Sequence, residues 1–267
     1  MTSPFRTGGG RGSVLYHLLD MSTLKAVEVR SCGSEMKRAS RVAMPLVNNR
    51  AEYVLHIAAR GTRVAHIGAA DSPYTRERLQ GGTLLHSRLL ALPDTDVVGL
   101  DVDVEGLALL RASFPAAQFD NVDVSSNIPI LHQGRYDCVI AGEVLEHVGN
   151  AEQFLLGCTT LLSPRGVLCV TVPNACSPKI GLRALGGTEV VHPDHRVYYS
   201  PRTLQRTLDS ADLEIVELLS YLAEPSRLGR LVNPILRAVH SIREGPIGEG
   251  LIAVARSRTG PHSPAGQ

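Results

Sequence analysis

The stretch YDCVIAGEVLEHVGNAEQFLLGCTTLLSPRGVLCVTV, residues 136–172, contains two apolar runs with a helical segment between them. The runs YDCVIAG (136–142) and GVLCVTV (166–172) are apolar at most positions, which is typical of strands buried on both faces. A helix is predicted over 150–162, because Asn150 can cap its first turn. Two buried strands joined by a helix predict a parallel βαβ unit.

The same alternation of apolar runs and helical segments continues on both sides of this unit. Ser200 and Pro201 open another helix, with serine as the N-cap and proline at the first helical position. The pattern predicts an α/β fold, with a doubly wound parallel sheet and helices on both of its faces. Further strands are predicted at 63–68, 96–102, 117–122, 213–219 and 250–256, and further helices at 75–90 and 104–113.

The two ends of the chain differ from this central region. Residues 1–13 and 257–267 are rich in Gly, Pro, Ser and Arg, so we predict two disordered tails. Over 35–60 apolar residues recur at helical spacing, and Pro45 should start or kink that helix. We therefore expect an N-terminal helical extension over 14–61.

The region 62–256 is expected to form one domain, with an insertion at about 222–249. Within this insertion, the segment 231–244 has apolar residues at helical spacing and arginines elsewhere on the same helix. Such a helix can cover a substrate cleft, contact a second subunit or dock on a membrane surface. The pattern alone leaves these three roles open, so a homodimer stays among the expectations.

The charge balance is close to neutral, with 27 basic and 26 acidic residues and a sequence pI near 7.8. Proteins that wrap polyanions usually carry a marked basic excess, and aromatic residues, at 4%, are too sparse for base stacking, so no nucleic-acid partner is expected. No apolar run is long enough to cross a bilayer. The five cysteines form no C-x-x-C pair, which argues against a disulfide framework and favours a cytoplasmic location.

In doubly wound sheets, ligands bind beyond the carboxyl ends of the strands. The first strand is followed by Gly68-Ala69-Ala70-Asp71-Ser72, small residues that let the backbone approach a ligand closely or simply make a tight turn. Asp101 ends the second strand, and its two oxygens can accept both hydroxyls of a ribose. Asp123 follows the third strand and can accept from an exocyclic amine or stabilise a turn.

The fourth strand ends in AGEVLEHVGN (141–150), which contains two carboxylates and an imidazole. Glu143, Glu146 and His147 stand at positions i, i+3 and i+4, so on a helix they would share one face. Such a set is either a solvated polar face or half of a metal site.

Together, these pieces resemble the class I S-adenosylmethionine-dependent methyltransferases. YDCVIAGEVLEHV and LLSPRGVLCVTVPNA carry the resemblance, and VVGLDVD and HPDHRVYYSPRTL match the same branch. That branch contains the ubiquinone-pathway O-methyltransferases and the cell-surface-polysaccharide methyltransferases. The resemblance covers roughly residues 62–220 and implies a Rossmann-like sheet of seven strands with an antiparallel last strand. It also implies S-adenosylmethionine as the cofactor.

The first motif departs from the family pattern. The family usually has an acidic residue followed by Gly-x-Gly-x-Gly, whereas this chain has His66 and a single glycine, Gly68. Ala70 and Ser72 are small enough to take the places of the missing glycines. The departure bears on the individual cofactor contacts more than on the class of cofactor.

The resemblance implies a role for each of the matching residues. The loop that begins at Gly68 would wrap the methionine part of the cofactor, Asp101 would hold the ribose, and Asp123 and Val124 would frame the adenine. Ala141 and Gly142 would line the methyl-transfer cleft. The full predicted cofactor set is Gly68, Ala69, Ala70, Asp71, Asp101, Val102, Asp123, Val124, Ala141 and Gly142.

Methyl transfer to an alcohol or phenol needs a base or a metal for the acceptor's proton. The candidate bases are His147, His192 and His195. The family of small-RNA terminal 2′-O-methyltransferases has a similar Glu-x-x-Glu-His pattern with a later Asp-His, which binds a divalent ion. That resemblance makes Glu143, Glu146, His147 and His195 a candidate site for Mg²⁺ or another divalent cation. Alternatively, His147 shapes the cleft and His195 bonds within a lid.

The sequence also lacks the motifs of another class of enzyme with a similar fold. A nicotinamide oxidoreductase would need a three-glycine fingerprint and an acid about 20 residues later, and neither is present. We expect an O-methyltransferase acting on a hydroxyl of a small metabolite, either a sugar or a natural-product scaffold. An N-methyltransferase and a non-catalytic protein with a cofactor-binding fold remain the alternatives.

Overall fold

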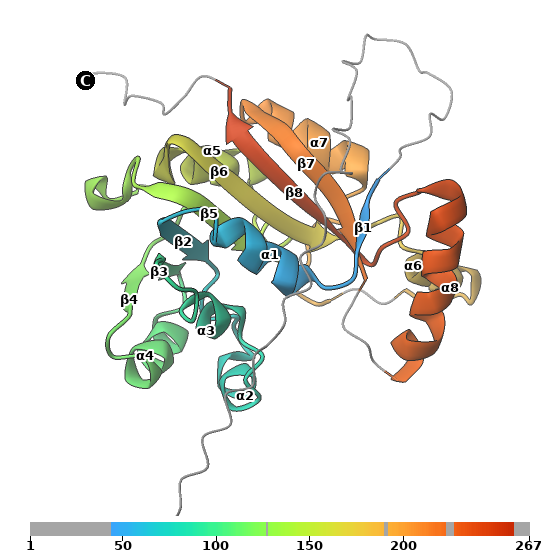
Figure 1. Ribbon diagram of the computed structural model, residues 1–267, viewed down its shortest axis with the longest axis horizontal. Coiled ribbons are helices and arrows are strands. Elements are labelled where there is room, and N and C mark those ends of the chain that lie inside the picture. Colours follow the sequence, from blue (N-terminus) through green and yellow to red (C-terminus); the bar gives the residue numbers. More distant parts are fainter. Residues whose placement is uncertain (1–43, 127, 190–191, 223–226, 259–267) are drawn as a thin grey trace, which may run out of the picture.

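The computed structural model describes residues 44–258, apart from 127, 190–191 and 223–226 (Figure 1). Its centre is one eight-stranded sheet, in the order β1-β7-β8-β6-β5-β2-β3-β4. The strands are β1 (Leu46–Val47), β2 (Arg63–Ile67), β3 (Asp96–Asp101), β4 (Gln118–Asn121), β5 (Tyr136–Gly142), β6 (Leu162–Pro173), β7 (Leu213–Tyr221) and β8 (Gly250–Ser257). The α-helices are α1 (Arg50–Ala58), α2 (Thr75–Gln80), α3 (Leu85–Leu89), α4 (Val104–Ser113), α5 (Ala151–Leu161), α6 (Pro178–Leu185), α7 (Pro201–Ser210) and α8 (Arg227–Arg243).

The predicted fold class is confirmed. All strand pairs are parallel except those of β8, the last strand, which runs antiparallel to both β6 and β7. The seven predicted strands are all present, and β1 adds an eighth at the edge of the sheet, where Leu46 pairs with Ser220. The predicted tail 1–13, residues 14–43 of the predicted extension and residues 259–267 lie outside the described residues.

Two helix predictions need correction. The helix expected over 35–60 begins only at Arg50 among the described residues, because residues 46–47 pair with β7 and the side chain of Asn49 caps the helix through the Glu52 N–H. The helix expected over 75–90 is two helices, α2 and α3, separated at Gly81 and Gly82. Gly82 has a φ of 65°, which interrupts a right-handed helix.

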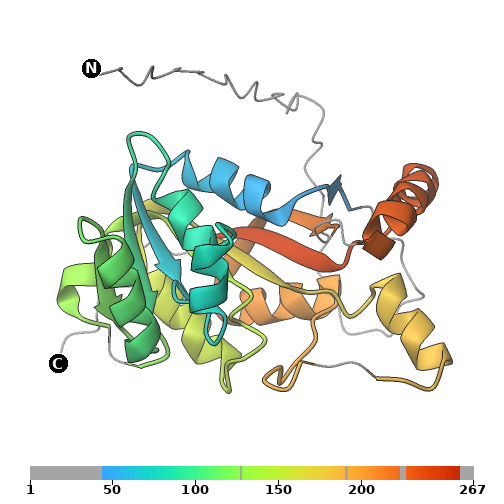
Figure 2. The same ribbon diagram turned by 90° about the horizontal axis from the view of Figure 1, so that it is seen from below.

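Helices cover both faces of the sheet, as Figure 2 shows. Successive residues of a strand point to opposite faces, so Val64 of β2 joins the core beneath α1 and α3, whereas Ala65 joins the core beneath α5 and α7. The helix caps follow the sequence: Asn150 accepts the N–H of Gln153, and Ser200 forms a reciprocal capping box with Thr203. Each face of the sheet thus carries its own apolar core, built from strand side chains and the helices that cover them.

The site-forming feature of this topology is the pairing of β2 with β5. From β2 the chain winds outward to β3 and β4, whereas β5 leads in the opposite direction to β6. Connections therefore leave this pair in opposite directions, and in sheets of this class that arrangement places the ligand crevice beyond the carboxyl ends of the pair. Among the described residues, no helix has the length and apolarity that a membrane crossing requires.

One glycine contact ties α5 to the connection that follows β4. A Cβ placed on Gly157 would lie 1.9 Å from the backbone oxygen of Val124, whereas one on Gly181 of α6 would meet nothing within 4 Å. We expect Gly157→Ala to lower the free energy of unfolding by at least about 1–3 kcal/mol through overpacking. Gly181→Ala, the matched control, should raise it by up to about 1 kcal/mol through helix propensity. Urea denaturation of both variants checks this, and equal effects would contradict the contact.

Candidate functional site

The backbone is strained on both sides of the crevice. Asp71, in the loop after β2, has a φ of 56°, and Glu143, directly after β5, has a φ of 57°. Non-glycine residues in this left-handed region cost about 1–3 kcal/mol and cluster at functional sites. Gly68 also has a positive φ, and a Cβ on it would come within 2.7 Å of the Val144 side chain. The two loops therefore pack too closely for a side chain at position 68.

Asp101, at the end of β3, fixes the loop after β2. Its Oδ2 accepts the N–H of Ala70 at 2.8 Å, and its Oδ1 accepts the N–H of Asp103 at 2.9 Å. Burial raises the pKa of Asp101, while these backbone hydrogen bonds act in the opposite direction. Each carboxylate oxygen keeps further acceptor capacity, so Asp101 can hold the loop and still face ribose hydroxyls.

The other predicted cofactor residues differ in exposure. Val102 is 64% exposed at the carboxyl end of β3, and Val124 is buried in the core. Asp123 is exposed, and its side chain accepts the N–H of Ser125, so it does stabilise a turn. Ala69, Ala70 and Ala141 are buried beside the crevice. All of these residues lie at or next to the carboxyl ends of β2 to β5, and their contacts with the cofactor remain predictions.

Glu143, Glu146 and His147 do not lie on a helix, so the shared face that their spacing would give on a helix is not formed. Residues 145–147 form a turn, and Glu143 before it has a left-handed φ of 57°. Oε1 of Glu143 accepts the hydroxyls of Thr171, at 2.9 Å, and Tyr221, at 3.0 Å. Glu143 lies outside the group whose candidate ligand atoms are within 4.8 Å of one another, and its predicted role as a metal ligand stays a prediction.

No sequence pattern pointed to Arg50, which the fold brings to the crevice. Its Nη1 donates to Thr171 Oγ1 at 3.2 Å and lies 3.7 Å from Glu143 Oε1. A Cβ on Gly142 would be 3.6 Å from the same nitrogen. Arg50 is the first residue of α1, and only the packing of α1 against β5 places its guanidinium beside the strand end. A lone arginine in an arginine-rich chain does not stand out by pattern.

The structure brings together Glu146, His147 and His195, with candidate ligand atoms within 4.8 Å of one another. Glu146 is fully buried, and neither of its carboxylate oxygens has a hydrogen-bond partner among the described residues. Nδ1 of His195 is equally unpartnered. Burial, reinforced by the charge of Glu143, holds the pKa of Glu146 well above its usual range. The cluster is therefore an unsatisfied set of ligand atoms around one small volume.

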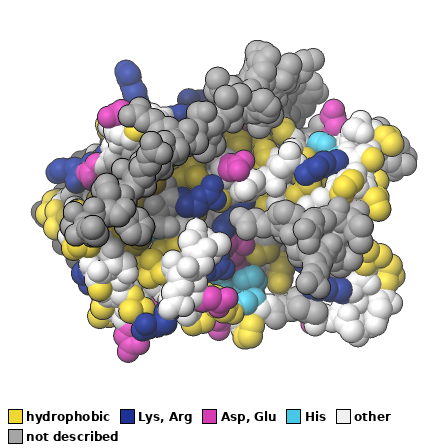
Figure 3. All heavy atoms as spheres, turned by 60° about the horizontal axis from the view of Figure 1, so that its bottom comes forward, with side chains coloured by type: hydrophobic (Ala, Val, Ile, Leu, Met, Phe, Trp, Pro, Cys, Tyr) yellow, Lys and Arg dark blue, Asp and Glu magenta, His cyan; other side chains and the backbone are white. Residues whose placement is uncertain are grey.

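The segment that carries the later histidines is held against this cluster. The N–H of Arg196 donates to the Glu146 carbonyl at 2.8 Å, and His147 Nδ1 lies 3.1 Å from the Asp194 carbonyl. The His192 ring centre is 5.0 Å from that of His195, but His192 falls outside the ligand group. Figure 3 shows histidine side chains reaching the surface beside acidic ones.

His66, which stands where the family has an acid, faces His86 of α3. The two Nδ1 atoms are 3.1 Å apart and the rings stack with centroids 5.3 Å apart. Both side chains are buried, and burial lowers both pKa values, that of His86 to about 4. The pair is therefore neutral at physiological pH, with one ring nitrogen donating to the other.

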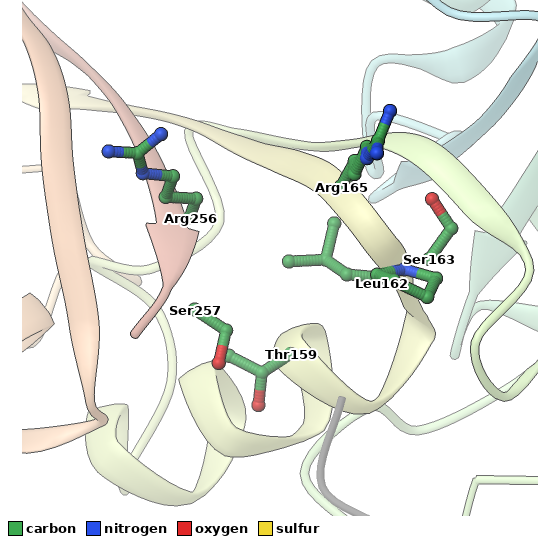
Figure 4. Close-up of a pocket in the computed structure, with 8 residues that line it drawn as sticks. Thr159, Leu162, Ser163, Arg165, Arg256 and Ser257 are labelled. Carbon is green, nitrogen blue, oxygen red and sulfur yellow. The ribbon is translucent and has the colours of Figure 1, made fainter. Parts of the chain in front are cut away.

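One pocket lies elsewhere, where β6 begins and β8 ends (Figure 4). It is lined by residues that include Thr159, Arg165 and Arg256. None of the predicted site residues is among its lining residues, and it lies at the start of β6, whereas the crevice lies beyond the other end of that strand. The side chains of the candidate site therefore lie at the carboxyl ends of the parallel strands, away from this pocket.

A model of the methyltransferase domain family matches residues 59–218, which include both loops of the crevice and the histidine segment. The chain belongs to the class I S-adenosylmethionine-dependent methyltransferases. The predicted family and enzyme class are confirmed.

Curated relatives support the same family. The chain is 32% identical over 143 residues to a ubiquinone biosynthesis O-methyltransferase of Psychrobacter cryohalolentis, covering 51% of this chain and 54% of the relative. It is 28% identical over 186 residues to the corresponding enzyme of Dinoroseobacter shibae, covering 66% of each chain. The chain thus spans about half the length of the first of these relatives.

A solved structure confirms the fold alone. The [4+2]-cyclase SpnF matches with a TM-score of 0.51 at 14% identity, covering 77% of this chain and 80% of that chain. At this identity the likeness says nothing about the reaction of the present methyltransferase.

The buried imidazole pair gives a pH prediction. Because the pKa of His86 is lowered from about 6.5 to about 4, the unfolded chain binds more protons between these values, so the free energy of unfolding falls as pH decreases through that window. For His86 the loss is about 3 kcal/mol. NMR titration of the imidazole Cε1 protons should show two buried rings that stay neutral down to about pH 4, of which that of His86 is assigned by its absence in His86→Gln. A His86 signal that titrates near pH 6.5 would contradict the buried neutral pair.

Proposed function

We propose that this methyltransferase transfers the methyl group of S-adenosylmethionine to a hydroxyl of a small metabolite, such as a sugar or a natural-product scaffold. The observation that carries the proposal is the Glu146–His147–His195 cluster beside the crevice, because an acceptor hydroxyl must lose a proton during transfer. The curated relatives reported above are named as O-methyltransferases, which also favours oxygen over nitrogen as the acceptor.

The crevice offers complementary groups to each part of the donor. Asp101 can accept from the ribose hydroxyls, and the loop after β2 allows close backbone approach beside it. The guanidinium of Arg50, at the end of β5, suits the carboxylate of the methionine part. The acceptor would then enter from the side of Glu146 and the histidines.

The reaction itself asks for alignment and proton removal. A bond forms between the acceptor oxygen and the methyl carbon as the sulfur–carbon bond breaks, and good alignment can supply about 7–11 kcal/mol of the barrier. The contact of His147 Nδ1 with the Asp194 carbonyl requires a proton on Nδ1, because a carbonyl can only accept. Nε2 of His147 is therefore left with a lone pair, as a proton acceptor or as a ligand.

The cluster also fits a divalent cation. Two buried carboxylate oxygens of Glu146 and one imidazole nitrogen of His195 lack partners among the described residues, which is costly unless a cation satisfies them. With Glu143 engaged elsewhere, the set is one carboxylate and two imidazoles, which suits Mn²⁺ or Zn²⁺ better than Mg²⁺. When bound, such an ion would lower the pKa of an acceptor hydroxyl.

The wider expectations are part of the same proposal. A small-molecule acceptor, a cytoplasmic location, no nucleic-acid partner and the option of a homodimer all stay predictions. The helix expected over 231–244 exists as part of α8, and the role of its exposed residues Ile235, Val239 and Ile242 stays open.

Removing the Asp101 carboxylate should weaken cofactor binding. We expect Asp101→Ala to cost about 1–3 kcal/mol of S-adenosylmethionine affinity, because ribose hydroxyls and the Ala70 N–H lose an acceptor. Asp96→Ala is the matched control, since Asp96 is an exposed carboxylate at the other end of β3. Isothermal titration calorimetry measures both, and wild-type affinity in Asp101→Ala would overturn the assignment of the ribose site to β3.

The proposed metal site can be tested by measuring the bound metal as well as the turnover. After exhaustive dialysis against a chelator and reloading with Mn²⁺ or Zn²⁺, elemental analysis should find about one ion per chain, and chelation should abolish turnover. Glu146→Gln and His195→Ala should each lower the ion affinity at least about tenfold. Glu143→Gln should keep the ion, because Glu143 lies outside the ligand group. Full activity with no bound metal, or loss of the ion in Glu143→Gln alone, contradicts the three-ligand site.

A further inference from the structure

Four elements meet through a hydrogen-bonded chain behind the crevice. The Tyr221 hydroxyl, at the end of β7, donates to Glu143 Oε1, and the Thr171 hydroxyl of β6 donates to the same oxygen. Thr171 in turn accepts from Arg50 Nη1 of α1. One carboxylate oxygen of Glu143 thus collects two hydroxyl donors and lies 3.7 Å from a guanidinium nitrogen.

The fold fixes the position of the Tyr221 ring. Tyr221 pairs with Gly250 across β7 and β8, and a Cβ on Gly250 would lie 2.1 Å from Cζ of the ring. The ring therefore fills the space that any side chain at position 250 would need. Burial and the neighbouring Glu143 carboxylate raise the pKa of Tyr221, so its hydroxyl keeps its proton and remains a donor.

The network explains why Glu143 tolerates its strained backbone. A left-handed φ and a half-buried carboxylate are each unfavourable, and they persist only where the surroundings determine them. Here two hydroxyl donors and a guanidinium hold the Glu143 carboxylate in place. The charge of Glu143 is then balanced by Arg50, whereas among the described residues the Glu146 carboxylate has no hydrogen-bond partner and lies near His195 Nε2, 3.9 Å from Oε1.

We propose that Tyr221 is a positioning residue for the methyl donor. Its hydroxyl fixes the Glu143 carboxylate, and Glu143 with Thr171 orients the Arg50 guanidinium. The oriented guanidinium then binds the carboxylate of the donor's methionine part with its remaining N–H groups. The inference rests on the proposed function, because it requires the donor to lie in this crevice.

The test uses two probes that differ only in the part Arg50 would bind. S-adenosylhomocysteine carries the amino-acid group, and 5′-methylthioadenosine keeps the adenine, ribose and sulfur without it. In Tyr221→Phe, the affinity for S-adenosylhomocysteine should fall about tenfold, and that for 5′-methylthioadenosine should stay within about twofold of wild type. Isothermal titration calorimetry on the full chain measures both.

Tyr53→Phe is the matched control. Tyr53 lies on α1, the helix of Arg50, and its hydroxyl is also bonded to a carboxylate, that of Glu217. Its loss should change neither affinity. If Tyr221→Phe does not fold, Thr171→Val removes the other hydroxyl with a similar shape and should show the same selective loss.

The outcomes distinguish the positioning role of Tyr221 from the proposed function. Affinities that fall together for both probes, or that do not fall at all, overturn the positioning role of Tyr221. A wild-type protein that binds neither probe overturns the proposed function itself, and the inference with it.

Discussion

The parallel pairing of β2 with β5 is the contact on which the rest of the structure depends. The registered pair Ile67 and Ala141 brings side by side two loops that are separated by more than a third of the domain in sequence. Because the chain leaves this pair in opposite directions, the connection of one loop does not run over the other, and sheets of this class bind their ligands at such a place. The positive φ angles of Asp71 and Glu143 mark how tightly these two exits are packed.

Two carboxylates only three positions apart, Glu143 and Glu146, divide the site between two tasks. Glu143 is balanced by Arg50 and two hydroxyls, so it is a fixed anion on the side that we assign to the donor. Glu146 is buried beside two imidazoles, and its carboxylate oxygens have no hydrogen-bond partner within the part of the chain that the structure describes, so it favours either a proton or a cation. Two nearby carboxyl groups in such different environments can take different roles in one site.

The strands were predictable because burial on both faces leaves an uninterrupted apolar run, as in YDCVIAG. The histidine segment was predictable in kind, since residues after a strand's carboxyl end converge there, but its contact with Glu146 depends on a hydrogen bond from Arg196 across the loop. The turn at Glu143 was missed because i, i+3, i+4 spacing describes a helix and carries no warning of a left-handed residue. Arg50, Tyr221 and β1 were missed because their roles arise from packing between segments far apart in sequence, which no local pattern records.

The central claim, that the methyl donor lies beyond the ends of β2, β3 and β5, is tested most directly by a crystal structure with S-adenosylhomocysteine. We expect electron density for the ribose hydroxyls within hydrogen-bonding distance of Asp101 and for the amino-acid carboxylate at Arg50. Density for the nucleoside elsewhere on the molecule, or a crevice filled by the chain's own side chains in the complex, would contradict it.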